Sequence, residues 1–148
     1  MGIVADAVLS GKGQATGVIP SLLVAKEVAH NGLTELHVVA SMHERKALMA
    51  ELADGFIALP GGWGTLEELF EVLTWGQLGL HRKPCGLLNV HGYFDHLLSF
   101  VQHSIDEAFL RRDYRSMLTI SDSPDALLDA FASYQPPLLE KWIDRAAT

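Results

Sequence analysis

The sequence lacks several features that would place it outside ordinary globular proteins. Its 148 residues contain one cysteine, Cys85, so an intrachain disulfide framework is excluded. No apolar run approaches the length of a membrane span and no signal peptide is recognised, which favours a cytoplasmic protein without a membrane partner. The formal charge of −7 argues against a non-specific nucleic-acid binder, because such a protein needs a basic face.

Three common site motifs are also missing. The seven histidines are scattered, none of them in an H-E-x-x-H arrangement, and Cys85 is isolated from them, so we expect no metal site. No Gly-Lys-Ser/Thr follows the one glycine-rich stretch of the chain, which excludes a Walker loop. That stretch does not fit G-x-G-x-x-G either, so a dinucleotide fingerprint is not supported.

The remaining composition, 49% hydrophobic and 20% charged, is that of one soluble domain over residues 1–148, with a tail from about residue 135. Apolar runs typical of buried strands alternate with helical patterns, and this alternation predicts an α/β fold whose parallel sheet is covered by helices on both faces. The expected strands are 15–19, 36–39, 56–59, 85–90 and 116–120. The expected helices are 1–10, 41–55, 65–79, 93–109 and 123–134, with a loop or short helix over 21–34.

The stretch from Gly55 to Gln77 carries the clearest functional signal of the sequence. Phe56–Leu59 predicts a buried strand, Pro60–Gly64 a glycine-rich turn, and Thr65 the start of a helix. The first N–H groups of a helix have no partner inside it and attract anions. Glycines in the turn allow a phosphate to approach the backbone closely and allow positive φ. The stretch therefore predicts a phosphate cradle.

The helix after the turn carries two further patterns. Four apolar residues lie on one face and should pack onto the sheet: Leu66, Leu69, Phe70 and Leu73. Glu67, Glu71 and Thr74 share another face, with Glu68 beside them. Thr65 and Glu68 fit a capping box with Thr65 at the N-cap, and the acidic face fits simple solvation near a helix N-terminus. For the glutamates of this helix, two alternatives therefore remain open: a purely structural role in capping and solvation, or a catalytic carboxylate.

A second helix is predicted from Ser41, with a capping box formed by Ser41 and Glu44 and an end at Gly55. Arg45 falls in the middle of its apolar stripe, which consists of Met42, Leu48, Met49 and Leu52. A guanidinium there needs an anionic partner, either a structural carboxylate or a phosphate bound through its planar fork. We favour phosphate, because ligands in parallel sheets bind at the carboxyl ends of strands, where Arg45, the glycine turn and Glu68 can converge. Lys46 lies on a different face, for which solvent exposure is the simplest reading.

Two motifs together resemble those of one family. Ser41-Met42-His43-Glu44-Arg45-Lys46 is similar to its M-H-x-R-K element, and the segment from Pro60 to Glu68 is similar to its P-G-G-x-G-T-x-x-E element. This is the LOG ("Lonely Guy") family of cytokinin riboside 5′-monophosphate phosphoribohydrolases, often labelled lysine decarboxylases. The resemblance extends from Gly2 to about Tyr134. It implies a Rossmann-like three-layer sandwich, a homodimer, and cleavage of the N-glycosidic bond of a nucleoside 5′-monophosphate.

The resemblance also implies residue roles. Arg45 and Glu68 match the family's catalytic pair. The positions that match its substrate contacts are Glu27, Met42, Lys46, Gly61, Gly62, Trp63, Gly64, Thr65, Leu66, Glu67 and Thr74. No metal or organic cofactor is implied, and no lysine stands in a convincing setting for pyridoxal phosphate, so lysine decarboxylation is not supported.

The expected reaction releases a free base, N6-modified adenine, together with ribose 5-phosphate. Two alternatives remain open: a general AMP or purine nucleotide nucleosidase, and a non-catalytic nucleotide-binding module. The second arises because the family's first strand and helix, with their glycine-rich nucleotide loop, have no counterpart before Met1-Gly2.

Overall fold

The computed structural model describes residues 2–24, 30 and 32–137. Its contacts group the chain into two compact units, Met1–Ala53 and Asp54–Thr148. The first unit contains α1 (Gly2–Ser10), β1 (Thr16–Pro20), α2 (Ser21–Val24), β2 (Glu35–Val39) and α3 (Met42–Leu52). The second contains β3 (Phe56–Ala58), α4 (Trp63–Gln77), β4 (Cys85–Leu88), η1 (Val90–Gly92), α5 (Asp95–Asp106), η2 (Arg112–Met117), β5 (Leu118–Ser121) and α6 (Pro124–Ala132). Within the described ranges no helix is long and apolar enough to cross a membrane.

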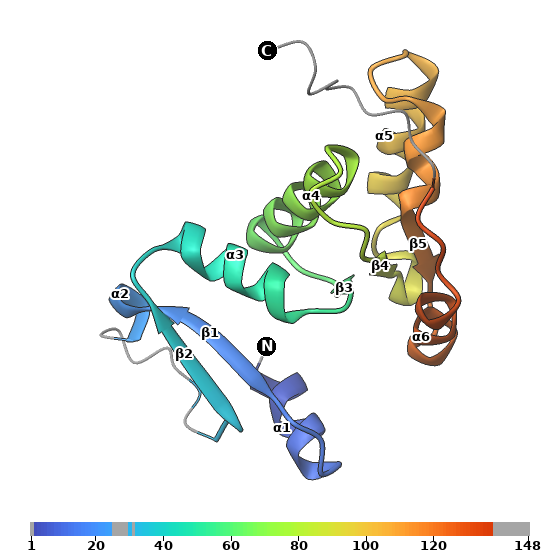
Figure 1. The fold of residues 1–148 in the computed structure, drawn as a ribbon. Helices are drawn as coiled ribbons and strands as arrows, with labels where there is room; N and C mark the ends of the chain where they lie inside the picture. Colours follow the sequence, from blue (N-terminus) through green and yellow to red (C-terminus); the bar gives the residue numbers. More distant parts are fainter. Residues whose placement is uncertain (1, 25–29, 31, 138–148) are drawn as a thin grey trace. The chain divides into compact units, whose positions relative to one another are not determined.

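The first unit is built on a two-stranded parallel sheet, visible as the paired arrows β1 and β2 in Figure 1. Thr16 stands opposite Glu35, and the register runs to Pro20 opposite Val39. The helix α3 contacts both strands. The strands β1 and β2 and the helix α3 correspond to the strands 15–19 and 36–39 and the helix from residue 41 that the sequence predicts.

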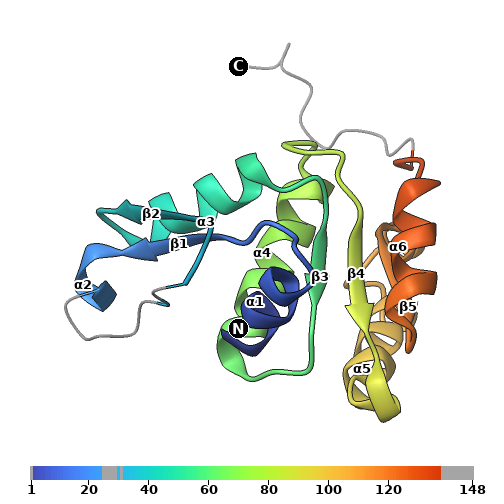
Figure 2. The same ribbon diagram turned by 90° about the horizontal axis from the view of Figure 1, so that it is seen from below.

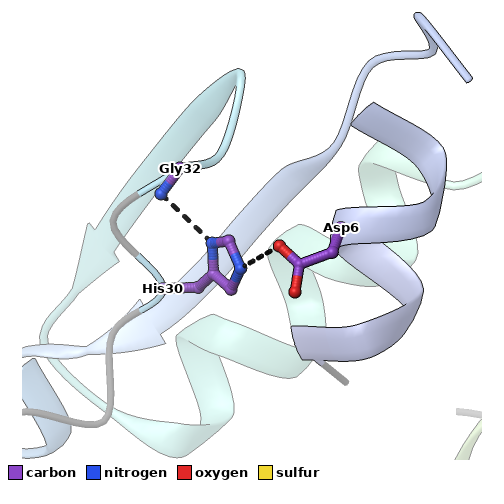
Figure 3. A network of polar contacts seen from close by, with 3 residues as sticks. All are labelled: Asp6, His30 and Gly32. Carbon is purple, nitrogen blue, oxygen red and sulfur yellow. Dashed lines mark hydrogen bonds and ion pairs between the residues drawn. The ribbon is translucent and has the colours of Figure 1, made fainter. Parts of the chain in front are cut away.

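A polar contact ties α1 to the chain before β2 (Figure 3). The N–H of Gly32 donates to Nδ1 of His30 over 3.1 Å, so the ring proton belongs on Nε2. That Nε2 lies 2.8 Å from a carboxylate oxygen of Asp6, to which it donates. The sequence indicates a turn at this point but gives no signal that pairs two residues so far apart in the chain.

The second unit is built on a three-stranded parallel sheet in the order β3-β4-β5. Cys85 in β4 stands opposite Phe56 on one side and Leu118 on the other. Side chains alternate between the two faces of a strand. Leu87 belongs to the cluster formed with α4 and α5, whereas a Cβ on Gly86 would lie 3.0 Å from atoms of Leu127 and Phe131 in α6.

Helices therefore cover both faces of this sheet, α4 and α5 on one and α6 on the other. Figure 2 shows β3 and β4 between α4 and α6. The core on the α4–α5 side consists of Leu69, Cys85, Leu87, Phe94 and Leu118, with partly buried neighbours from the same elements. The predicted class, an α/β fold with parallel strands flanked by helices, is confirmed, with the strands divided between two sheets.

Several predicted details need correction. The strand β3 is not fully buried, since Ile57 is 39% exposed. The last strand begins at Leu118, because residues 116 and 117 belong to the 3-10 helix η2. The helix α5 spans residues 95–106 and is shorter than the predicted 93–109. The predicted end of α4 at Gly79 is confirmed: Gly79 has φ 77°, and the Leu80 N–H donates to the Trp75 carbonyl, as in a Schellman motif.

Candidate active site

The start of α4 differs from the prediction. The helix begins at Trp63 with Gly62 as its N-cap, and no side chain caps it. Thr65 is therefore the third helical residue, and the predicted capping box of Thr65 and Glu68 is wrong. The reason lies in the turn, since the Gly62 carbonyl accepts the first bond of the helical ladder from the Leu66 N–H at 3.1 Å.

This earlier start places three N–H groups ahead of the ladder, those of Trp63, Gly64 and Thr65. Such groups carry partial positive charge, and together with the helix dipole they favour an anion at this end of α4. The groups lie at the carboxyl end of β3, where parallel sheets place their ligands. The start of α4 therefore has the backbone donors that the predicted phosphate cradle requires.

The three glycines of the turn have different environments. A Cβ on Gly61 would lie 2.9 Å from the Thr65 Cβ, so intrachain packing explains this glycine. A Cβ on Gly62 or Gly64 would meet no atom of residues 54–137 within 4 Å. Positive φ, which the sequence suggested for this turn, occurs among the described glycines only at Gly79 and Gly92. Neither packing within the unit nor a positive φ accounts for Gly64, whereas Gly62 is the N-cap of α4, a position that favours glycine.

A residue that sequence reasoning missed anchors the turn. The Tyr93 hydroxyl donates to the Gly61 carbonyl over 2.8 Å. Tyr93 follows η1, where the Asn89 side chain accepts from the Phe94 N–H at 2.7 Å and donates to Asp95 at 2.8 Å. No local sequence signal links residues 61 and 93, because the contact depends on β3 and β4 being neighbours.

The acidic face of α4 is arranged as predicted. Glu67, Glu71 and Thr74 follow each other at helical spacing, and Glu68 is half-buried in the second turn. The Thr74 hydroxyl donates to the Phe70 carbonyl at 2.7 Å, so its oxygen keeps only acceptor capacity toward a ligand. Phe70 was expected to pack onto the sheet with Leu66, Leu69 and Leu73, but it is exposed.

In the first unit, the predicted cap of α3 is confirmed, since the Ser41 hydroxyl accepts from the Glu44 N–H at 3.1 Å. The Glu44 carboxylate accepts from Ala40 at 2.8 Å, one residue before the N-cap. The helix ends at Leu52, before the predicted Gly55. Its predicted apolar stripe is not buried, because three of its members are exposed: Met42, Met49 and Leu52.

Arg45 and Lys46 are both half-buried, and the apolar stripe around Arg45 is largely exposed, so burial does not force Arg45 to take an anionic partner. The structure thus brings together the predicted residues of the second unit, which run from Gly61 to Glu68 and include Thr74 on the same helix. Met42, Arg45 and Lys46 lie together on α3 in the first unit, so their convergence with Glu68 stays a prediction. Glu27 lies outside the described residues.

Two titratable groups of the second unit have clearly raised pKa values. Burial raises the pKa of the Cys85 thiol from 9.0 to about 12. Burial, and next the charge of Cys85, raise the pKa of Tyr134. Cys85 is therefore a protonated core thiol at neutral pH. Among the described residues no group of three or more histidine, cysteine or acidic side chains is placed to hold a metal ion.

Comparison with known proteins decides the family. Residues 1–131 match the model of the family described as "Possible lysine decarboxylase". The chain is 53% identical over 134 residues to the cytokinin riboside 5′-monophosphate phosphoribohydrolase of Rhodococcoides fascians, covering 90% of this chain and 68% of that protein. The chain belongs to the LOG family.

Plant LOG proteins are similar to a comparable degree. LOG7 of Arabidopsis thaliana, a cytokinin riboside 5′-monophosphate phosphoribohydrolase, is 48% identical over 136 residues, which cover 92% of this chain and 63% of that protein. The probable phosphoribohydrolase LOGL6 of Oryza sativa subsp. japonica is 47% identical over 136 residues, covering 92% and 54%. The chain thus spans between 54% and 68% of the length of these three LOG relatives.

Proposed function

We propose that this chain hydrolyses the N-glycosidic bond of N6-modified adenosine 5′-monophosphates, releasing the free base and ribose 5-phosphate. The observation that carries the proposal is the start of α4, where three N–H groups precede the helical ladder and two glycines lie open to a ligand. The names of the LOG relatives support the same substrate, since each relative is described as a phosphoribohydrolase of cytokinin riboside 5′-monophosphates.

The 5′-phosphate of the substrate is held by the turn and by the N–H groups of Trp63, Gly64 and Thr65. Backbone donors of this kind bind an anion without a flexible side chain that would have to be ordered. Lys46 and Arg45 of α3 are the proposed side-chain ligands, with the planar guanidinium suited to two phosphate or carboxylate oxygens.

Cleavage breaks the bond between C1′ of the ribose and N9 of adenine, and positive charge builds up on the ribose as in other glycoside hydrolyses. Glu68 is the proposed catalytic carboxylate. It stabilises that charge and takes a proton from the attacking water, whose oxygen bonds to C1′. The base leaves with the bonding electron pair and gains a proton, which gives free adenine derivative and ribose 5-phosphate.

The protein is further proposed to act in the cytoplasm as a homodimer, folded as a single domain, with no nucleic acid or membrane as partner. The composition supports the absence of nucleic acid, because a charge of −7 repels phosphate backbones. Exposed apolar side chains on α3 and α4, among them Leu52 and Phe70, are compatible with a second copy.

The test is chromatographic detection of free base from three compounds: N6-isopentenyl-AMP, AMP, and N6-isopentenyladenosine, which lacks the phosphate. We expect release from the first, slower release from AMP, and almost none from the nucleoside. Equal release from both nucleotides would favour a general AMP nucleosidase. Binding of nucleotides without any release would favour the non-catalytic module.

The variant Glu68→Gln removes the proposed base while keeping the shape of the side chain. We expect kcat to fall by about 10²- to 10⁴-fold, which is the usual contribution of a general base. The matched control is Glu107→Gln, an exposed carboxylate after α5, which should leave turnover unchanged. Near-normal turnover in Glu68→Gln would remove Glu68 from the mechanism.

A further inference from the structure

A cavity of about 200 Å³ lies in the second unit between α4, α5 and η2. Apolar side chains form most of its wall: Leu69 and Leu73 come from α4, Leu97 and Leu98 from α5, and Leu87 from the sheet beneath. In another protein, an apolar cavity of about 150 Å³ stays free of water and takes up benzene. The size and the wall of this cavity therefore suit an apolar group as large as one aromatic ring.

Two neighbouring residues of η2, Tyr114 and Arg115, add polar groups to the apolar wall. Tyr114 is 7% exposed, and its buried hydroxyl has no hydrogen-bond partner in the part of the chain that the structure describes. Leaving such a group unpaired is unfavourable, and native structures rarely do so. The hydroxyl is therefore a donor that a bound ligand can satisfy.

The guanidinium of Arg115 is half-buried and has donors left for a ligand. It donates from Nη1 to the carbonyl of Leu118, a residue that also lines the cavity, over 3.1 Å. A guanidinium has five N–H donors, and within the described residues Arg115 forms no ion pair with a carboxylate. The described residues that line the cavity include no aspartate or glutamate. An anion is favoured here, and a carboxylate matches the planar fork of the arginine.

We propose that this cavity binds an aromatic monocarboxylate of the size of benzoate. The ring fills the leucine-lined space, and the carboxylate accepts hydrogen bonds from Arg115 and from the Tyr114 hydroxyl. Of the described residues assigned to the proposed active site, only Thr74 lines the cavity, and none from the turn at the start of α4 does. The inference goes beyond the proposed function, because it requires no nucleotide at that turn and no hydrolysis.

The experiment follows the amide NMR signals of the unmodified chain during titration with sodium benzoate and with benzamide, which has the same shape without the charge. We expect benzoate to bind with a Kd of about 0.1–1 mM, the scale for so small a ligand. Benzamide should bind about tenfold more weakly, because it lacks the charge-assisted contact. The signals of Val101 and Leu118 in the cavity wall should shift most. Equal affinities, no binding of benzoate, or shifts confined to residues 62–65 at the start of α4 would overturn the inference.

Variants of η2 test the two polar contacts. Arg115→Gln should weaken benzoate binding by about tenfold and leave benzamide binding unchanged. The matched control is Arg112→Gln, an exposed arginine of the same 3-10 helix, which should change neither affinity. Tyr114→Phe should weaken benzoate binding by about three- to tenfold, the scale of one hydrogen bond.

The Tyr114 variant also keeps the test valid if Arg115→Gln fails to fold for want of its bond to the Leu118 carbonyl. Removing a hydroxyl that has no partner in the free protein should not lower thermal stability, so a loss of affinity in Tyr114→Phe reports the ligand contact alone. Unchanged benzoate affinity in Tyr114→Phe and in the folded Arg115→Gln would overturn the assignment. Normal benzoate binding by a chain that releases no base would uphold the cavity assignment and refute the proposed hydrolase.

Discussion

Among the described residues, the unit Asp54–Thr148 buries nine apolar side chains around a three-stranded sheet, whereas in the unit Met1–Ala53 the burial is limited to Pro20. In the first unit a two-stranded sheet leaves Val38 55% exposed and all of α3 without a buried residue. A two-stranded sheet is rarely stable by itself, whereas a sheet of three strands with helices on both faces can form a stable core. The difference indicates that the turn before α4 is supported by a buried core, whereas α3, which carries Arg45, contributes no buried residue.

The largest expected effect tests this difference in stability. Leu87→Ala, at a fully buried position in β4, should lower the free energy of unfolding by about 2–5 kcal/mol, through lost burial and a residual cavity. Val38→Ala in β2 should cost less than about 1 kcal/mol, because its side chain is already exposed. Denaturant unfolding of both variants is the measurement.

Equal losses for the two variants would mean that β2 is buried in the protein in solution and that the contrast between the units is wrong. Hydrogen exchange on the unmodified chain gives a second check. Amides of β4 should be the most protected and those of β2 less so. Uniform protection would instead favour the single cooperative domain that the sequence predicts.

Sequence reasoning could predict the α/β class, every strand to within a few residues, and the turn and helix that follow β3, because these depend on local periodicity and turn chemistry. It placed the start of α4 at Thr65 because threonine is a good N-cap, but the helix begins at Trp63 after a glycine. It could not find the Tyr93–Gly61 bond or the Asp6–His30 pair, since both depend on how strands and helices are brought together. The exposure of the α3 stripe was missed because helical periodicity alone does not say what covers a face.

The second prediction asks whether the first unit contributes to the chemistry. Arg45→Ala should lower kcat/KM for N6-isopentenyl-AMP by about 100-fold, the scale of a lost charge-assisted contact in a site. The conservative variant Arg45→Lys should recover only part of this, because an ammonium lacks the planar fork. Steady-state kinetics of both variants measures these changes in kcat/KM. Unchanged values would mean that Arg45 takes no part in the reaction and that the active site is formed by the second unit.

A third, smaller effect concerns the buried thiol of the second unit. The pKa of Cys85 is raised from 9.0 to about 12 in the folded chain, so between these values the folded state holds a proton that the unfolded state has released. Stability should therefore fall as pH rises through this window, by at most about 1.4 kcal/mol per pH unit. Urea unfolding of the unmodified chain and of Cys85→Ala should differ in this slope, and identical slopes would show that Cys85 is not buried.

The smallest expected effect concerns the anchor of the turn. Tyr93→Phe removes the hydrogen bond to the Gly61 carbonyl, and the free energy of unfolding should fall by about 0.5 kcal/mol, since the side chain is partly exposed. If the bond holds the cradle in shape, KM for the nucleotide should rise while kcat stays near normal. A change in kcat alone would mean that Tyr93 acts elsewhere in the reaction.

The phosphate seat at the start of α4 is most directly tested by amide NMR of the Glu68→Gln variant, which should bind N6-isopentenyl-AMP without consuming it. The account predicts that the amide signals of Gly62, Trp63, Gly64 and Thr65 shift most on titration, and that N6-isopentenyladenosine, without the phosphate, leaves them in place. Nucleotide binding that shifts other amides while these four stay unchanged would contradict the cradle.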